Sequence, residues 1–118
     1  MPHYVEGFVV PVPKDRIADY RKLARRVGKL FMEHGALSVT ECLADDVKPG
    51  KWTSFPQSVK LKDGETVVFS WITYRSRKHR DSIAAKVMKD ARMDMDPSSF
   101  PFDGKRMIFG GFKTMLEL

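Results

Sequence analysis

The sequence predicts an α+β fold in which one antiparallel four-stranded sheet carries two helices on one face. The first observation behind this prediction is that β-rich and amphipathic helical segments follow each other in the order β-α-β-β-α-β. The second is that 118 residues with one cysteine suit one domain that builds its core without disulfides. We therefore expect a single domain over residues 1–118, with the ferredoxin-like arrangement of its elements.

The first half of the chain is expected to place a long helix between two strands. Residues 4–12 are rich in β-branched and aromatic residues and end among prolines, which cannot donate to a ladder. Residues 14–34 carry apolar side chains at helical spacing, and Gly35 is a natural C-cap. Residues 36–44 alternate apolar and polar side chains, which is typical of a strand. The basic residues of the helix, interpreted as its solvent side, are Arg21, Lys22, Arg25, Arg26 and Lys29.

The second half is expected to supply two more strands and the second helix. A long connection over residues 45–65 comes first, with a possible helical turn at 54–61. Residues 66–75 are the most β-prone segment, and Ser76 is a plausible N-cap for the helix that follows. Residues 93–105 are expected to break that helix, because they contain Pro97, Pro101 and Gly104. Residues 105–118 are predicted to form the last strand, in which two adjacent glycines indicate a bulge or a close backbone approach.

Both faces of the predicted sheet are apolar. The strand at 66–75 places Val67, Phe69 and Trp71 on one face and Val68, Ile72 and Tyr74 on the other. Two helices cover only one face, so the other face needs a partner or remains a large exposed patch. We expect a second copy to cover it, which gives a homodimer around a two-fold axis. The alternative is a monomer in which the 45–65 connection folds over the sheet.

Composition and charge narrow the classes of partner. The net charge of +6 favours anionic partners. No apolar run reaches the roughly 20 residues of a membrane span, and the N-terminus shows no secretion signal, so we expect a cytoplasmic protein. The single cysteine, Cys42, suits a reducing compartment and is expected to be a small buried hydrophobe. No spacing of His, Cys and acidic residues predicts a metal or a cofactor.

Three interpretations of the basic stretch Arg75–Arg80 are open. RNA binding is the first, because the RNA-recognition motif has the same element order and aromatic residues on its third strand; Val67 and Val68 replace its basic residue and glycine, which disfavours nucleic acid. The second is an anion site at a helix N-terminus, formed by Arg77, Lys78 and Arg80. The third is a purely structural cluster in which Asp81 pairs with one of the cations.

A pocket for a small, partly apolar molecule is the function that the pattern favours most, placed between the sheet and the long connection. A purely structural or regulatory dimer is the non-enzymatic alternative. For an enzyme, we expect oxygenation or isomerisation without a metal, with His79 or Glu41 as the base. Trp52 and Phe55 could close the pocket as a lid or anchor the connection. The candidate binding residues are Tyr4, Glu6, Phe8, Glu41, Phe69, Trp71 and His79.

Three stretches carry a resemblance to a known family. They are "YVEGFVVPVPKD", "ECLADDVKPGKWTSFPQSVKLKDGETVVFSWITYRSRKHRD" and "PFDGKRMIFGGF", and they resemble the YbaA-like family of uncharacterised bacterial proteins (domain of unknown function family 1428). The resemblance implies a dimeric α+β barrel, the assembly of small antibiotic-biosynthesis monooxygenases and stress-response barrel proteins. It implies no activity. The Lys89–Pro97 stretch looks short beside that family, so the second helix is expected to end early. Haem-degrading members of this wider group use an Asn with His and Trp, and the absence of Asn here speaks against that chemistry.

Overall fold

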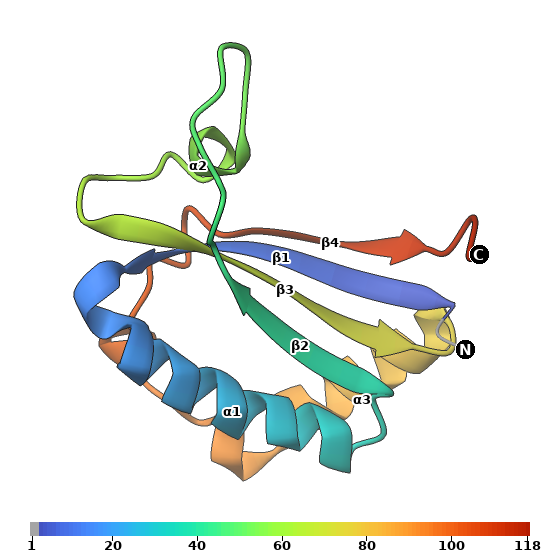
Figure 1. Cartoon of the computed structure of the whole chain (residues 1–118). Coiled ribbons are helices and arrows are strands. Elements are labelled where there is room, and N and C mark those ends of the chain that lie inside the picture. Colours follow the sequence, from blue (N-terminus) through green and yellow to red (C-terminus); the bar gives the residue numbers. More distant parts are fainter. Residues whose placement is uncertain (1–2) are drawn as a thin grey trace.

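A computed structural model describes residues 3–118 and contains one four-stranded sheet (Figure 1). The spatial order of the strands is β2-β3-β1-β4, and each neighbouring pair is antiparallel. The predicted class, a mixed α+β fold with an antiparallel sheet, is therefore confirmed. The strands are β1 (Tyr4–Pro13), β2 (Ser38–Leu43), β3 (Glu65–Tyr74) and β4 (Ile108–Lys113).

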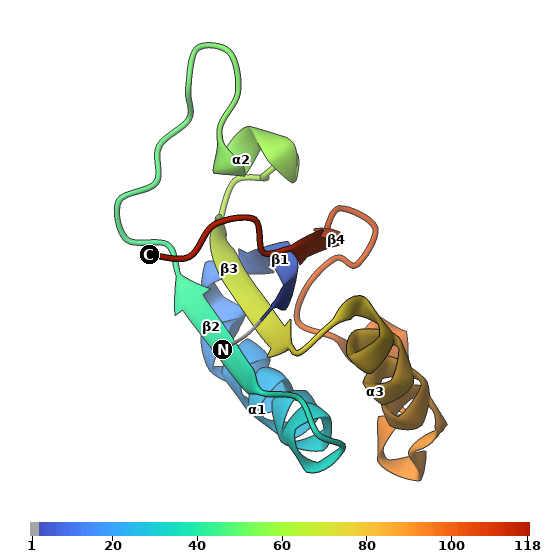
Figure 2. The ribbon, with the colours of Figure 1, turned by 90° about the vertical axis from the view of Figure 1, so that its right-hand side faces the viewer.

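The two long helices lie on one side of the sheet. They are α1 (Ile17–Glu33), which follows the 3-10 turn η1 (Lys14–Arg16), and α3 (Arg77–Lys89). The short helix α2 (Phe55–Ser58) belongs to the connection between β2 and β3, residues 44–64, which we call the arm. Figures 1 and 2 show that the arm rises on the side of the sheet opposite α1 and α3. Within residues 3–118, no helix is both long and apolar enough to cross a lipid bilayer.

The predicted helix boundaries follow from local capping chemistry. Gly35, the residue after the C-cap His34 of α1, adopts a φ of 115°, a left-handed conformation that glycine tolerates without strain. The hydroxyl of Ser76 accepts a hydrogen bond from the backbone N–H of His79 at 3.1 Å, which caps α3 as predicted. Ser54 caps α2 in the same way, through the backbone N–H of Gln57.

The last strand is shorter than predicted. The sequence indicated a strand over residues 105–118, whereas β4 covers only Ile108–Lys113. The strand β4 is an edge strand that pairs only with β1, and β1 begins at Tyr4. The last backbone contact therefore joins the N–H of Thr114 to the carbonyl oxygen of His3 at 3.0 Å. Residues 114–118 continue past the start of β1, and no strand of the described residues 3–118 pairs with them.

Side chains that lie close to the backbone explain why position 111, one of the two adjacent glycines, has no side chain. A Cβ atom at this position would lie 2.7 Å from Cζ of Tyr4 and 2.9 Å from Nη1 of Arg80. The pairing register of β1 and β4 runs without interruption from Ile108 to Lys113. Of the two possibilities that the sequence left open, the structure therefore shows a close approach of side chains to the backbone rather than a bulge.

The register assigns each strand residue to a face, because directly opposed residues point to the same side. The helix face carries the main core, and its side chains pack against α1 and α3. The outer face is covered where the arm packs on it, with Val59 against Val9 and Val67 and with Phe55 against Phe69. Cys42 lies on the outer face of the edge strand β2 and is exposed, which corrects our expectation of a buried thiol.

Candidate functional site

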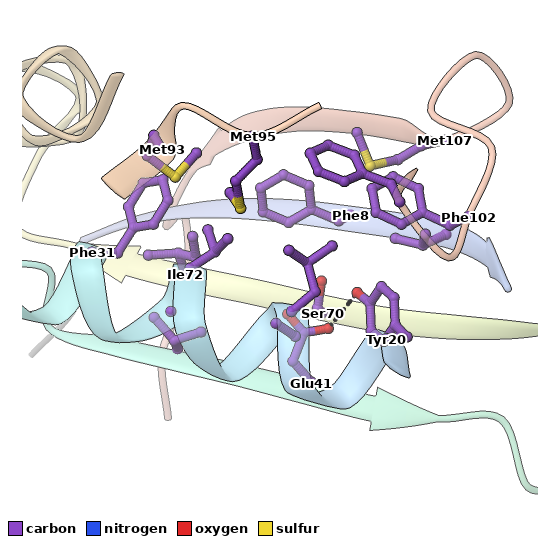
Figure 3. A pocket seen from close by; sticks show the side chains of 17 residues that line it. Phe8, Tyr20, Phe31, Glu41, Ser70, Ile72, Met93, Met95, Phe102 and Met107 are labelled. Carbon is purple, nitrogen blue, oxygen red and sulfur yellow. Dashed lines mark hydrogen bonds between the residues drawn. The ribbon is translucent and has the colours of Figure 1, made fainter. Parts of the chain in front are cut away.

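A cavity of about 230 Å³ lies between the helix face of the sheet, α1 and the segment from Met93 to Met107 (Figure 3). The lining is dominated by aliphatic, aromatic and methionine side chains, with three polar residues. Figure 3 shows side chains of β1, β3, α1 and the C-terminal segment pointing into the same space. The labelled lining residues are Phe8, Tyr20, Phe31, Glu41, Ser70, Ile72, Met93, Met95, Phe102 and Met107.

The early end of α3 leaves room for this cavity. The helix stops at Lys89 after packing Ile83 and Val87 into the core beside Tyr74. An irregular segment with two 3-10 turns, η2 (Ala91–Met93) and η3 (Pro97–Ser99), then covers the rest of the helix face. Methionine and phenylalanine side chains of this segment fill the space incompletely, because no regular helix packs against the sheet there. The sequence prediction that the second helix ends early is confirmed.

Small residues on α1 set the distance between this helix and the sheet. A Cβ atom on Gly28 would lie 3.1 Å from Cγ1 of Val39, so α1 and β2 come into close contact at that point. Ala24 lies one turn earlier in α1 and also lines the cavity. Tyr20, one further turn earlier, reaches across to the sheet with its hydroxyl group. The wall of the cavity toward β2 is therefore one side chain thick.

The polar end of the cavity consists of Tyr20, Glu41 and Ser70. The hydroxyl of Tyr20 donates a hydrogen bond of 2.7 Å to Oε1 of Glu41. Ser70 is buried and stands opposite Glu41 in the pairing of β2 with β3. Burial raises the pKa of the Glu41 carboxyl, and hydrogen bonding with Tyr20 and Ser70 opposes that rise. Burial, together with the nearby Glu41 charge, also raises the pKa of Tyr20, which therefore keeps its proton.

Replacement of Glu41 by Gln is expected to make the stability less dependent on pH. A carboxyl whose pKa is raised in the folded state binds more protons there than in the unfolded chain. The wild-type free energy of unfolding therefore decreases as pH rises from the ordinary Glu value through the raised value. Urea unfolding between pH 4 and pH 8 should show that the free energy of unfolding of Glu41→Gln rises relative to that of the wild type as pH increases. A stability difference that stays constant over this range would contradict the raised pKa.

The seven predicted binding residues do not form one cluster. Phe8 and Glu41 line the cavity. Tyr4 and Glu6 lie on the same face, four and two residues before Phe8, where Nη1 of Arg80 donates to Oε2 of Glu6 at 2.9 Å. The guanidinium of Arg80 also lies 5.2 Å from the ring centre of Tyr4. Tyr4 and Glu6 are thus engaged in a structural contact between β1 and α3.

Phe69 and Trp71 lie on the outer face, away from the cavity. Their ring centres are 5.6 Å apart, and Phe55 of the arm packs on Phe69 at 5.7 Å. Phe55 thus anchors the arm to the sheet, whereas Trp52 is 85% exposed and contacts Lys51. The cavity that contains Glu41 is therefore not the predicted space between the sheet and the long connection.

His79 and the basic cluster lie at the start of α3. Nδ1 of His79 accepts a hydrogen bond from the backbone N–H of Arg75 at 3.0 Å, and its ring packs edge-on against Tyr74. Arg80 is held by Glu6 and by Asp81 at 2.7 Å. The predicted pairing of Asp81 with a cation is present, while Arg77 contacts the same carboxylate only at 3.9 Å. His79 does not line the cavity.

The sequence reasoning missed Tyr20 and Ser70, although a signal for Ser70 existed. A serine in the middle of the most β-prone segment, between Phe69 and Trp71, is out of place on a buried face unless it has a partner. Tyr20 carried no such signal, because it belongs to the apolar stripe of a long helix. Within residues 3–118, no group of three or more His, Cys, Asp or Glu side chains is placed to hold a metal ion.

Fold and site together define an α+β protein with one antiparallel sheet and an apolar cavity under its helix-covered face. The model of the family described as "Protein of unknown function (DUF1428)" matches residues 3–104, and the chain belongs to this family. It is 50% identical over 114 residues to the uncharacterized protein YbaA of Escherichia coli K12, and equally to that of Shigella flexneri, with 97% of both chains covered. A de novo designed protein, Foldit4, is similar at a TM-score of 0.44 and 12% sequence identity. The match covers 98% of this chain and 99% of the Foldit4 chain.

Proposed function

We propose that this protein is a cytoplasmic homodimer of ferredoxin-like protomers, a dimeric α+β barrel, that binds a small, partly apolar molecule in the helix-face cavity. The observation that carries the proposal is an apolar cavity of about 230 Å³ with one polar end. Ligand sites are typically apolar concavities in which a few polar groups fix the orientation of the ligand. Here Tyr20, Glu41 and Ser70 are those groups.

The size of the cavity limits the ligand. An apolar protein cavity of roughly 150 Å³ accommodates benzene. A cavity of about 230 Å³ therefore suits a single substituted ring or a short branched chain. The hydroxyl groups of Tyr20 and Ser70 and the carboxylate of Glu41 favour a ligand with one hydroxyl or carbonyl group at that end.

The same groups support a conversion as well as binding. A carboxylate with a raised pKa at the end of an apolar cavity is suited to accept a proton from a bound molecule. Tyr20 and Ser70 can donate hydrogen bonds to the oxygen on which negative charge then develops. The reaction class that this arrangement favours is a proton-abstraction isomerisation with Glu41 as the base.

The outer face supports the dimer. Among the described strand residues that the register assigns to it, only Glu65 at the start of β3 carries a charge, and Arg106 pairs with it. Phe69, Ile108 and Phe112 are exposed there in the single chain. Binding of the RNA phosphate backbone would need basic side chains on this surface. The composition of the outer face therefore fits a second apolar sheet better than RNA. The residues concerned are Val5, Gly7, Val9, Pro11, Pro13, Ser38, Thr40, Cys42, Glu65, Val67, Phe69, Trp71, Thr73, Ile108, Gly110 and Phe112.

A variant that fills the cavity tests the binding proposal. Ala24→Leu replaces a methyl group in the cavity wall by an isobutyl group, so we expect the affinity for 4-ethylphenol, a ring with one hydroxyl, to fall at least tenfold. Titrations followed by amide chemical shifts measure this affinity. Ala18→Leu is the matched control, because Ala18 lies on the exposed side of the same helix. Equal binding by both variants, or no binding to the wild type at millimolar concentration, would remove the cavity as the ligand site.

A further inference from the structure

A second hollow lies on the other side of the cavity wall. It is a groove of about 540 Å³ between α1 and the edge strand β2. The groove and the cavity share five lining residues, and these form the one-side-chain wall described above. The shared residues are Tyr20, Ala24, Gly28, Val39 and Glu41. The hydrogen bond from Tyr20 to Glu41 belongs to this partition, so its opening would join the two spaces.

Three basic residues of α1 line the groove. Arg21, Arg25 and Lys29 follow each other at intervals of four residues and therefore form one row along the helix. All three are exposed, and none forms an ion pair with an acidic side chain of residues 3–118. Glu41 is the single acidic residue in the lining, so the groove carries a net positive charge.

Apolar side chains line the rest of the groove. Ile17, Met32 and Leu43 line it beside the basic row, and Met32 and Leu43 are exposed. A molecule that matches the whole surface combines an apolar body with a negatively charged group. Guanidinium groups bind carboxylates through paired, charge-assisted hydrogen bonds, so a carboxylate is a well-matched anion for Arg21 and Arg25.

We propose that the ligand is an amphipathic carboxylate whose apolar part occupies the cavity and whose carboxylate is bound in the groove by Arg21 and Arg25. This inference rests on the proposed binding function and adds the chemical class of the ligand. The ligand passes between Tyr20 and Glu41, whose hydrogen bond opens when the ligand enters, so that both groups can bond a hydroxyl or carbonyl group between its apolar part and its carboxylate. The remaining basic residues of the helix, Lys22 and Arg26, do not line the groove and lie at a different surface depression.

The test compares octanoate with 1-octanol, two probes with the same chain and different head groups. Calorimetric or chemical-shift titrations of the full chain are expected to give at least tenfold tighter binding of octanoate. Exposed ion pairs each contribute modestly. We therefore expect Arg21→Gln to weaken octanoate binding about threefold and Arg21→Gln with Arg25→Gln about tenfold, while octanol binding stays unchanged. Lys22→Gln is the control, because it removes one charge from the neighbouring position outside the groove.

Each other result would overturn the inference in a distinguishable way. Equal affinity for octanoate and octanol would show that the groove does not select an anion, while binding in the cavity would still stand. An equal loss of octanoate affinity in Lys22→Gln and Arg21→Gln would show a general effect of charge rather than a specific binding site. Binding of 4-ethylphenol without either octyl probe would restrict the ligand to the cavity and exclude the groove. Failure of all three probes would remove the proposed function as well.

Discussion

Replacement of Phe112 by Glu is expected to convert the protein from a dimer into a monomer at micromolar concentration. Phe112 lies on the outer face of β4, opposite Val5, and 65% of it is exposed in the single chain. In the proposed dimer, the variant places a carboxylate in an apolar interface without a cationic partner. Burying an unpaired charge costs several kcal/mol, so we expect the dissociation constant to rise at least ~100-fold, or about 3 kcal/mol.

Phe109 is the matched control for this experiment. It lies on the same strand and is also 65% exposed, but it faces the other side of the sheet and stacks on Phe8. Phe109→Glu should therefore leave the dimer intact. Sedimentation velocity over 1–100 µM separates the two outcomes. A wild-type protein that sediments as one 13.5 kDa chain throughout this range would contradict the dimer. Salt-sensitive retention of RNA by that monomer would instead assign the outer face to nucleic acid.

Replacement of Arg106 by Met is expected to cause the largest loss of stability. The guanidinium of Arg106 forms two hydrogen bonds of 2.7 Å with Glu65 and one of 3.0 Å with Asp103. The side chains of Arg106 and Glu65 are only 13% and 10% exposed. Removal of Arg106 leaves the Glu65 carboxylate with little solvent and without its ion-pair partner. We expect a loss of about 3 kcal/mol, measured as a fall of roughly 10 °C in Tm.

Arg92→Met provides the comparison, because Arg92 also bridges two carboxylates, those of Asp90 and Glu33. The side chains of Arg92 and Glu33 are 53% and 54% exposed, and Asp90 keeps His34 as a partner at 3.0 Å, so the Tm should change little. An equal fall in Tm for both variants would show that burial does not determine the strength of the Arg106 contact. Arg106 precedes Met107, so the same variant should loosen the end of the cavity wall.

The Arg106 contact also predicts how stability responds to acid. Hydrogen bonding with Arg106 lowers the pKa of Glu65 below its ordinary value of 4.5, although partial burial opposes this. A carboxyl with a lowered folded pKa contributes stability that is complete above the ordinary value. That stability is lost as pH falls through the lowered value. The gap in Tm between wild type and Arg106→Met should therefore narrow on acidification below about pH 4.5.

Many local features could be predicted from the sequence because they depend on neighbouring residues in the chain. The apolar spacing of α1, the caps at Ser76 and Gly35 and the early end of α3 are of this kind. The alternation of the β3 segment also gave the correct two sets of side chains. The length of β4 was wrong, because an edge strand ends where its only neighbour begins, and β1 begins at Tyr4.

The candidate site was predicted less well than the fold. Alternation divides Phe69 and Ser70 between two faces, but it does not tell which face the helices cover. The prediction combined Phe69 and Trp71 with Phe8 and Glu41, and the register of β1 with β3 places these two pairs on opposite sides. Aromatic residues drew attention to the outer face, while the cavity is marked by a serine and a glutamate.

By itself, the sequence determined the type of element at each place in the chain, the composition of both sheet faces and the family. These properties depend on residues close together in the chain or on matches along it. Only the tertiary structure decided that Tyr20 meets Glu41, 21 positions later, that Arg106 meets Glu65, and that the groove adjoins the cavity. Such contacts depend on strand register and on how closely α1 approaches β2, and both are fixed only when the whole core packs together.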